Sequence, residues 1–174
     1  MLQSLDNSLI IQALENVVCQ IMLAVKTAPK GKGVDVLEMK YVTDVEKERL
    51  AQTMDEIGNE TATAFFHRDA ENIRKSQVVL LLATNNTVRG LNCGYCGSNC
   101  KDKSNDIHCV FNIIDLGIAM GSAVSSAMLY KIDNRILYSA GKAALKLGFF
   151  DKNIPLIFAI PFSISEKNIF FDRK

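Results

Sequence analysis

Two short and almost uninterrupted apolar segments place the tightest limit on how this chain can fold. They read VVLLLAT, from Val78 to Thr84, and IPLIFAIPF, from Ile154 to Phe162. Both are too short to cross a bilayer, and both are too continuous for a strand that has one face in water. They therefore predict interior strands that helices cover on both faces.

Other segments supply the expected helices and a further strand. Residues 9–25 carry apolar residues at the spacing of one helix face, and Cys19 in this segment is predicted to be a small core residue. Residues 34–42 alternate apolar and charged side chains, which predicts a strand with one buried face. Thr43 and Glu46 then have the spacing of a capping box, and a helix is expected to follow as far as about residue 66.

A long helix is predicted from Cys109 to Tyr130. Within it Gly117, Gly121 and Ser125 are four residues apart, so they share one face. A face made of small residues allows close approach, either by another helix or by the flat ring of a cofactor. Asparagine, aspartate and serine side chains in this segment argue against a membrane span.

Four of the five cysteines are close in sequence. Cys93, Cys96 and Cys100 have the spacing C-x2-C-x3-C, and Cys109 follows at the predicted start of the long helix. Four thiolates suit a [4Fe–4S] cluster or a tetrahedral zinc ion. Three cysteines in a glycine-rich loop with a more distant fourth favour the iron–sulfur cluster. The glycines, which can adopt positive φ and so fold the loop tightly, are Gly90, Gly94 and Gly97.

Two alternatives to a four-cysteine cluster stay open. His108 could replace Cys109 as a ligand in a zinc site of three cysteines and one histidine. The cysteines could instead form a redox dithiol in a flavoenzyme, without a metal.

Composition limits the remaining possibilities. With 174 residues, 48% of them hydrophobic and 22% charged, the chain suits one domain over residues 1–174, with the cysteine-rich loop 90–109 inserted between a core strand and the long helix. A net charge of +1 gives no field to attract nucleic acid or anionic lipid. The N-terminal residues do not resemble a secretion signal, so we expect a cytoplasmic protein whose cysteines are thiols or metal ligands. With only two histidines, hydrolysis by a histidine base is not expected.

Five separated motifs resemble a known family, the uncharacterised microbial proteins that contain a ferredoxin domain. The likeness extends from about residue 24 to the C-terminus, and it implies an iron–sulfur cluster on Cys93, Cys96, Cys100 and Cys109. The motifs are RDAENIR (68–74), GLNCGYCG (90–97), IDLGIAMGSAV (114–124), DNRILYSAGKAA (133–144) and KNIFFDR (167–173).

The order of helices and strands more distantly resembles the flavin-dependent nitroreductases. That resemblance implies an α+β fold with a central, mainly antiparallel sheet, a homodimer, and FMN at the subunit interface. Lys30 and Lys32 in the loop after the first helix, with Arg68 and Arg74, are then candidates to bind the flavin phosphate. The alternative is that the lysines are solvated turn residues and that Arg68 forms a local ion pair with Asp69.

The sequence thus predicts an iron–sulfur electron-transfer protein, and an FMN-dependent oxidoreductase if flavin is bound near Gly117 and Gly121. Its partner would be an electron-transfer protein or a small redox substrate. The alternative function is a zinc-stabilised structural or binding module without redox activity.

Overall fold

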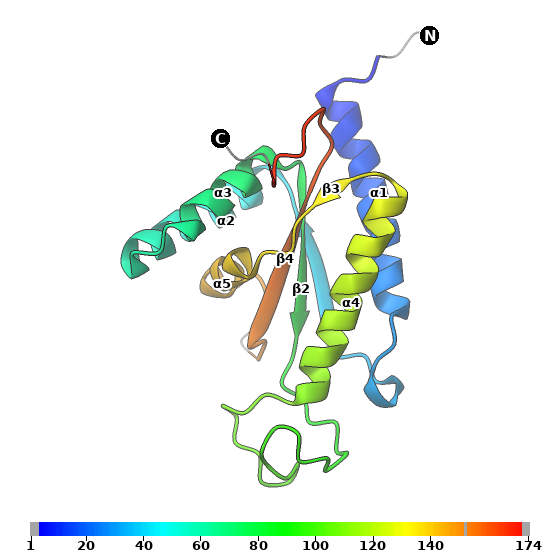
Figure 1. The fold of residues 1–174 in the computed structure, drawn as a ribbon, viewed down its shortest axis with the longest axis vertical. Helices are drawn as coiled ribbons and strands as arrows, with labels where there is room; N and C mark the ends of the chain where they lie inside the picture. Colours follow the sequence, from blue (N-terminus) through cyan, green and yellow to red (C-terminus); the bar gives the residue numbers. More distant parts are fainter. Residues whose placement is uncertain (1–3, 152, 172–174) are drawn as a thin grey trace.

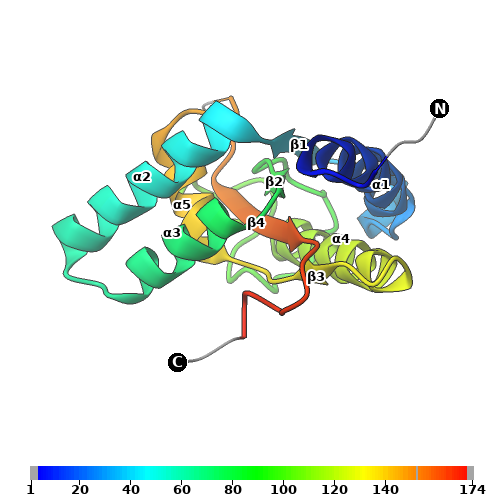
Figure 2. The ribbon, with the colours of Figure 1, turned by 90° about the horizontal axis from the view of Figure 1, so that it is seen from above.

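The structure is a computed structural model that describes residues 4–151 and 153–171. It contains a four-stranded sheet with helices on both faces, which confirms the predicted α+β class (Figures 1 and 2). The elements in chain order are α1 (Asn7–Thr27), the 3₁₀ turn η1 (Gly31–Gly33), β1 (Leu37–Val42), α2 (Asp44–Thr61), α3 (Phe65–Lys75), β2 (Val78–Thr84), α4 (Val110–Leu129), β3 (Asp133–Asn134), α5 (Tyr138–Lys146) and β4 (Leu156–Ser163).

The two apolar runs become the two central strands of the sheet. The strand order is β1-β2-β4-β3, and every neighbouring pair is antiparallel. All residues of β2 are buried, as expected for a strand covered on both faces. β1 lies at the edge, and its predicted buried face is only partly buried: Leu37 and Met39 pack on the core, whereas Tyr41 is 38% exposed.

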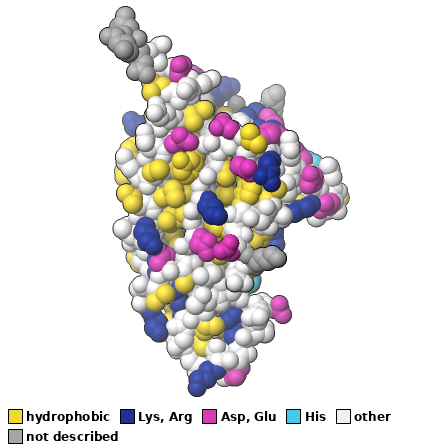
Figure 3. Space-filling model, turned by 180° about the vertical axis from the view of Figure 1, so that it is seen from behind, with side chains coloured by type: hydrophobic (Ala, Val, Ile, Leu, Met, Phe, Trp, Pro, Cys, Tyr) yellow, Lys and Arg dark blue, Asp and Glu magenta, His cyan; other side chains and the backbone are white. Residues whose placement is uncertain are grey.

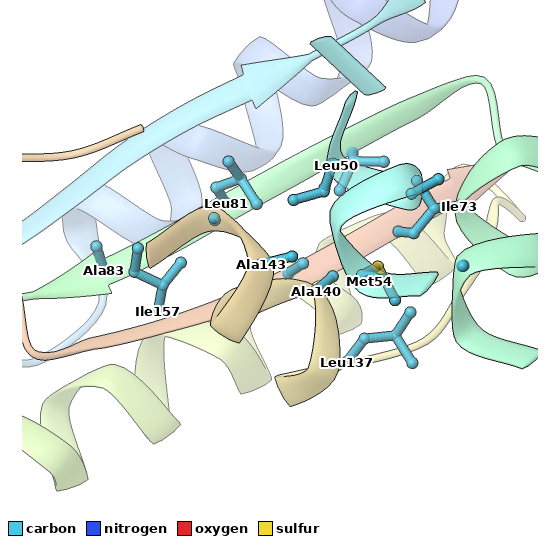
Figure 4. Packing of buried hydrophobic residues seen from close by; sticks show 14 of the residues in the cluster. Leu50, Met54, Ile73, Leu81, Ala83, Leu137, Ala140, Ala143 and Ile157 are labelled. Atoms are coloured by element: carbon cyan, nitrogen blue, oxygen red, sulfur yellow. The ribbon is translucent and has the colours of Figure 1, made fainter. Parts of the chain in front are cut away.

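Alternate residues of β2 point into two separate cores. Val78, Leu80 and Leu82 pack with α1 and α4, while residues 79, 81 and 83 pack with α2, α3 and α5. Figure 2 shows the two groups of helices on opposite sides of the sheet. Figure 4 shows the second core, where α5 lies close against β4.

Helix α1 begins and ends where its local sequence requires. The Asp6 side chain accepts a hydrogen bond from the Leu9 N–H at 2.9 Å and so caps the first turn. The helix ends at Thr27, because Pro29 disfavours a helical conformation at Ala28. The core face consists of Leu14 and three further residues, but Cys19 is exposed. The prediction of Cys19 as a core residue was therefore wrong.

The helix expected over residues 43–66 is interrupted. Ala62 has a φ of 51°, which ends α2, and α3 starts three residues later. The predicted capping box is also wrong, since Thr43 makes no side-chain capping bond and Glu46 pairs with Arg49 at 2.7 Å. Acidic residues in the first turn still favour this helix start through the helix dipole.

Two apolar helices leave much of their surface uncovered. By length and composition both α1 and α4 could cross a membrane, but each packs one face against the sheet, as a core helix does. On α4, Ile114 is 47% exposed, Ile118 42%, and Leu129 82%. On the rear of the molecule, apolar side chains also gather over the face that includes α1 (Figure 3). One layer of the fold thus presents apolar side chains to its surroundings.

Candidate metal centre

The cysteine-rich segment is a long connection without helix or strand, from residue 85 to residue 109, between β2 and α4. It lies beyond one end of the sheet (Figure 1). Gly90, Gly94 and Gly97 have φ values of 67°, 73° and 77°, as expected for glycines that fold the loop tightly. Long loops of this kind within a compact fold usually carry function.

The four predicted ligands differ in exposure. Cys93 is exposed, Cys96 and Cys100 are half-buried, and Cys109 is buried at the N-terminus of α4. The Cys100 sulfur accepts a hydrogen bond from the Asn92 N–H at 3.2 Å, and the Asn92 side-chain oxygen accepts one from the Cys100 N–H at 3.2 Å. Bonds from N–H groups to sulfur stabilise thiolates and tune iron–sulfur clusters.

The chain does not close the predicted site by itself. Within residues 4–151 and 153–171, no group of three or more histidine, cysteine, aspartate or glutamate side chains is placed to hold a metal ion, and all five cysteines are free thiols. The chemistry of the donor set still suits a cluster, because it provides four cysteines, a backbone donor to sulfur and flexible glycines. His108 is exposed beside Cys109.

Buried polar residues attach the start of this loop to α4. Asn112 donates from Nδ2 to the carbonyl oxygens of Asn85 at 3.0 Å and Thr87 at 2.7 Å. Arg89 forms an ion pair with Asp115 at 2.5 Å, and these side chains are only 2% and 3% exposed. Sequence reasoning missed these roles, although Asn112 and Asp115 are conspicuous as polar residues within an apolar helix.

The predicted flavin-loop lysines are occupied by contacts within the chain. Lys30 Nζ donates to the carbonyl oxygens of Val25 and Lys26 at 2.8 Å and of Ala28 at 2.9 Å, so it caps the C-terminus of α1. Lys32 Nζ donates to the carbonyl oxygen of Arg89 at 3.2 Å. Lys32 therefore contacts the start of the cysteine loop.

The predicted arginines belong to the other side of the sheet, on α3. Arg68 pairs with Asp69 at 2.8 Å, as the local alternative predicted. Arg74 pairs with Asp55 at 2.7 Å and with Glu48 at 3.1 Å. The six predicted cofactor residues thus form two groups, one on each face of the sheet.

Gly117 and Gly121 lie on the exposed face of α4. A Cβ atom built at either position would meet nothing within 4 Å. The small-residue face is therefore open to a partner.

The hollows in the described part of the chain include two that are large enough for a small ligand. One, of about 510 Å³, adjoins the cysteine loop; the other, of about 430 Å³, lies between α2, α3 and α5. Neither is lined by a predicted cofactor residue. The first is lined by Asn85, Asn86, Thr87, Asn105, Asn153 and Pro155, and the second by Ile57, Thr61, Thr63, Phe65, Phe66, Tyr138 and Lys142.

The ion pairs of Asp55 lead to a prediction about stability and pH. Burial alone would raise the pKa of Asp55, but hydrogen bonds from Arg74 and His67 outweigh burial and lower the pKa below 3.8. The carboxylate thus stabilises the fold above pH 3.8, and this contribution is lost as pH falls through the folded-state pKa.

We expect Asp55→Asn to lower the free energy of unfolding by up to about 1 kcal/mol at neutral pH. Urea denaturation at several pH values should show this difference shrinking only below pH 3.8. A difference that stayed constant through the acidic range would contradict the assignment.

Comparison with known proteins identifies the family. The chain is 41% identical over 159 residues to an uncharacterised protein of Archaeoglobus fulgidus, and the match covers 85% of each chain. Residues 105–173 match the model of a protein family described as uncharacterised proteins containing a ferredoxin domain (DUF2148). This chain belongs to that family. The matched segment of this DUF2148 protein includes Cys109, while Cys93, Cys96 and Cys100 precede it. Residues 172 and 173 of the closing motif lie outside the described residues.

Solved nitroreductase structures share the fold of this DUF2148 protein. The nitroreductase CinD from Lactococcus lactis, in complex with nicotinic acid, matches with a TM-score of 0.67 and 13% identity over 95% of this chain and 82% of that chain. A nitroreductase with bound FMN from Desulfitobacterium hafniense matches with a TM-score of 0.63 and 12% identity over 95% and 81%. The predicted nitroreductase-like fold is confirmed.

The hypothetical oxidoreductase YcnD from Bacillus subtilis also matches, with a TM-score of 0.63 and 14% identity over 88% of this chain. The DUF2148 protein spans only 58% of that structure's length. The oxidoreductase therefore contains a substantial part that has no counterpart in this match.

Proposed function

We propose that this protein is an iron–sulfur electron-transfer protein whose cluster is bound by Cys93, Cys96, Cys100 and Cys109. The observation that carries the proposal is the cysteine-rich loop, which presents four free thiols and ends at the N-terminus of a long helix. A [4Fe–4S] cluster would supply one-electron redox chemistry there. The family description as ferredoxin-domain proteins supports this reading.

The residues of the chain would hold and orient the sulfurs. The Asn92 N–H donates to the Cys100 sulfur, and the N-terminal N–H groups of α4 favour a thiolate at Cys109. Asn112 and Asp115 hold the loop's first residues against the same helix. The electron partner would be a protein or a small redox molecule, in the cytoplasm.

Iron, sulfide and zinc analysis of protein purified without oxygen tests the proposal. We expect iron and acid-labile sulfide in equal amounts, with little zinc. Zinc in place of iron would support the second candidate, a structural or binding module, which the tetrahedral capacity of four cysteines favours.

Flavin binding is a separate part of the proposal. FMN is present in a solved structure of the same fold, and Gly117 and Gly121 leave an open surface on α4. If FMN binds at this surface, the protein is an FMN-dependent oxidoreductase, with Lys30 and Lys32 as the candidates to contact it, because their turn packs against α4. Arg68 and Arg74 lie on the opposite face of the sheet, so they are not candidates at the same site. Flavin without iron would instead indicate a flavoenzyme with a redox dithiol.

We further propose that two copies pack through the exposed face of α4. This face combines exposed isoleucines with glycines that permit close helix contact. Burying such a face in a homodimer would remove its apolar side chains from water.

Ile118→Arg should weaken self-association about 100-fold or more, because an unpaired charge would be buried in the interface. Sedimentation equilibrium measures this change. Val45→Arg is the matched control, since Val45 is a 71% exposed apolar residue on α2, and this variant should keep the wild-type mass. A wild-type protein that is monomeric at all concentrations would contradict the dimer.

A further inference from the structure

A buried charge pair connects three segments that are distant in sequence. Asp115 on α4 accepts hydrogen bonds from the Gly31 N–H at 2.9 and 3.1 Å, in addition to its ion pair with Arg89. Arg89 Nη1 donates to the carbonyl oxygen of Val34 at 2.5 Å, and its own carbonyl accepts from Lys32. The pair thus joins the turn after α1, the start of the cysteine loop and the first turns of α4.

Stability alone does not explain this pair. Removing two charges from water is costly, and apolar side chains of similar volume often stabilise a core equally well. Among the described residues, two buried polar atoms near this pair have no hydrogen-bond partner. They are the Nε–H of Arg89 and the Oδ1 of Asn112. Leaving a buried polar atom unsatisfied is costly, so nearly all such atoms find partners in native structures.

The place of the pair in the chain relates it to the cysteines. Arg89 precedes Cys93 by four residues, and Asp115 follows Cys109, the N-cap of α4, by six residues. Six residues of α-helix correspond to about 9 Å along the helix axis. The pair therefore flanks the predicted ligands along the chain, with Arg89 before the first and Asp115 after the last, at the base of the loop.

We propose that Arg89 and Asp115 are positioning residues of the cysteine site, and that their opposite charges set the reduction potential of the cluster bound there. The inference rests on the proposed iron–sulfur function. One-electron reduction adds a negative charge, which a buried guanidinium stabilises and a buried carboxylate disfavours. Removing either charge should therefore shift the potential, and the two shifts should have opposite signs.

A spectroelectrochemical titration of the anaerobically purified holoprotein tests this inference. Asp115→Asn should raise the potential and Arg89→Met should lower it, each changing the ratio of oxidised to reduced protein at a fixed ambient potential on the order of tenfold. Asp69→Asn is the matched control. Asp69 is also buried and paired with an arginine, but it contacts Ser139 on the opposite face of the sheet, so this variant should keep the wild-type potential.

Opposite shifts distinguish a charge effect from damage to the loop. Two shifts of the same sign, or no shift in either variant, would overturn the inference. If Arg89→Met does not fold, the inference is tested with Asp115→Asn and Arg89→Lys. Asp115→Asn must then raise the reduction potential, and Arg89→Lys, which keeps the positive charge, must leave it unchanged. Wild-type protein without iron would contradict the proposed function itself, whereas wild-type iron with unshifted variants would contradict only the role of the charge pair.

Discussion

Replacing Cys96 with serine should lower the amount of metal bound per chain at least about tenfold, since even changes to groups around metal ligands commonly weaken binding 10- to 100-fold. Serine retains the size of the side chain but offers no thiolate. Iron and zinc content of the purified variant, compared with wild type prepared in parallel, measures the effect. The expected loss applies to a cluster and to a zinc ion alike.

Cys19 provides the matched control for this experiment. It is also a free thiol and is exposed on α1, away from the cysteine loop. Cys19→Ser should bind as much metal as wild type. If Cys96→Ser also retained full metal content, Cys96 would not be a ligand, and the assignment of four cysteines would be wrong.

Gly141→Ala should be among the most destabilising single changes in the protein. A Cβ at this position would lie 1.8 Å from the carbonyl oxygen of Ile157 and 2.6 Å from its carbonyl carbon. These atoms belong to the backbone of central strand β4, so a side-chain rotation cannot relieve the clash. The neighbouring residues Ala140 and Ala143 and the strand residue Ile157 are visible in Figure 4.

We expect Gly141→Ala to cost at least about 3 kcal/mol, which corresponds to a fall in Tm of roughly 6–12 °C for a chain of this size. Thermal denaturation followed by circular dichroism measures the change. Lys142→Ala is the control, because it also introduces alanine on α5, at the next position, but the Lys142 side chain is exposed. That variant should be as stable as wild type or slightly more stable. A wild-type Tm for Gly141→Ala would mean that α5 does not pack on β4 as described.

The parts of the fold that the sequence predicted are those controlled by local pattern. The run from Val78 to Thr84 is apolar without interruption, because its alternate side chains enter two different cores. The residues around Leu14 have the helical spacing of a single buried face. In both cases the spacing of apolar residues along the sequence reflects which side chains are buried in the structure.

Features that depend on tertiary contacts were missed. Nothing local signals that Ala62 adopts a left-handed conformation and divides the predicted second helix. Cys19 is compatible with either face of its helix, and only the packing of α1 on the sheet places it outside. The same reason applies to Lys30, whose ammonium group turns back to cap α1.

The cysteine-rich loop was predictable from the sequence, but the contacts that attach it to the rest of the fold were not. The cysteine spacing and the positive φ of the loop glycines follow from the sequence. The pairing of Arg89 with Asp115 does not, because the two residues are 26 positions apart and meet only when α4 packs beside the turn after α1. The sequence feature that could have indicated a buried charge pair is Asp115 itself, an aspartate within an otherwise apolar helix.

The visible absorption spectrum of protein purified without oxygen, recorded before and after dithionite, distinguishes an iron–sulfur redox protein from a zinc-stabilised module. We expect a broad iron–sulfur absorption that bleaches on reduction, with resolved flavin bands in addition if FMN is bound. A colourless protein that contains stoichiometric zinc would contradict the redox function and identify the cysteine loop as a structural zinc site.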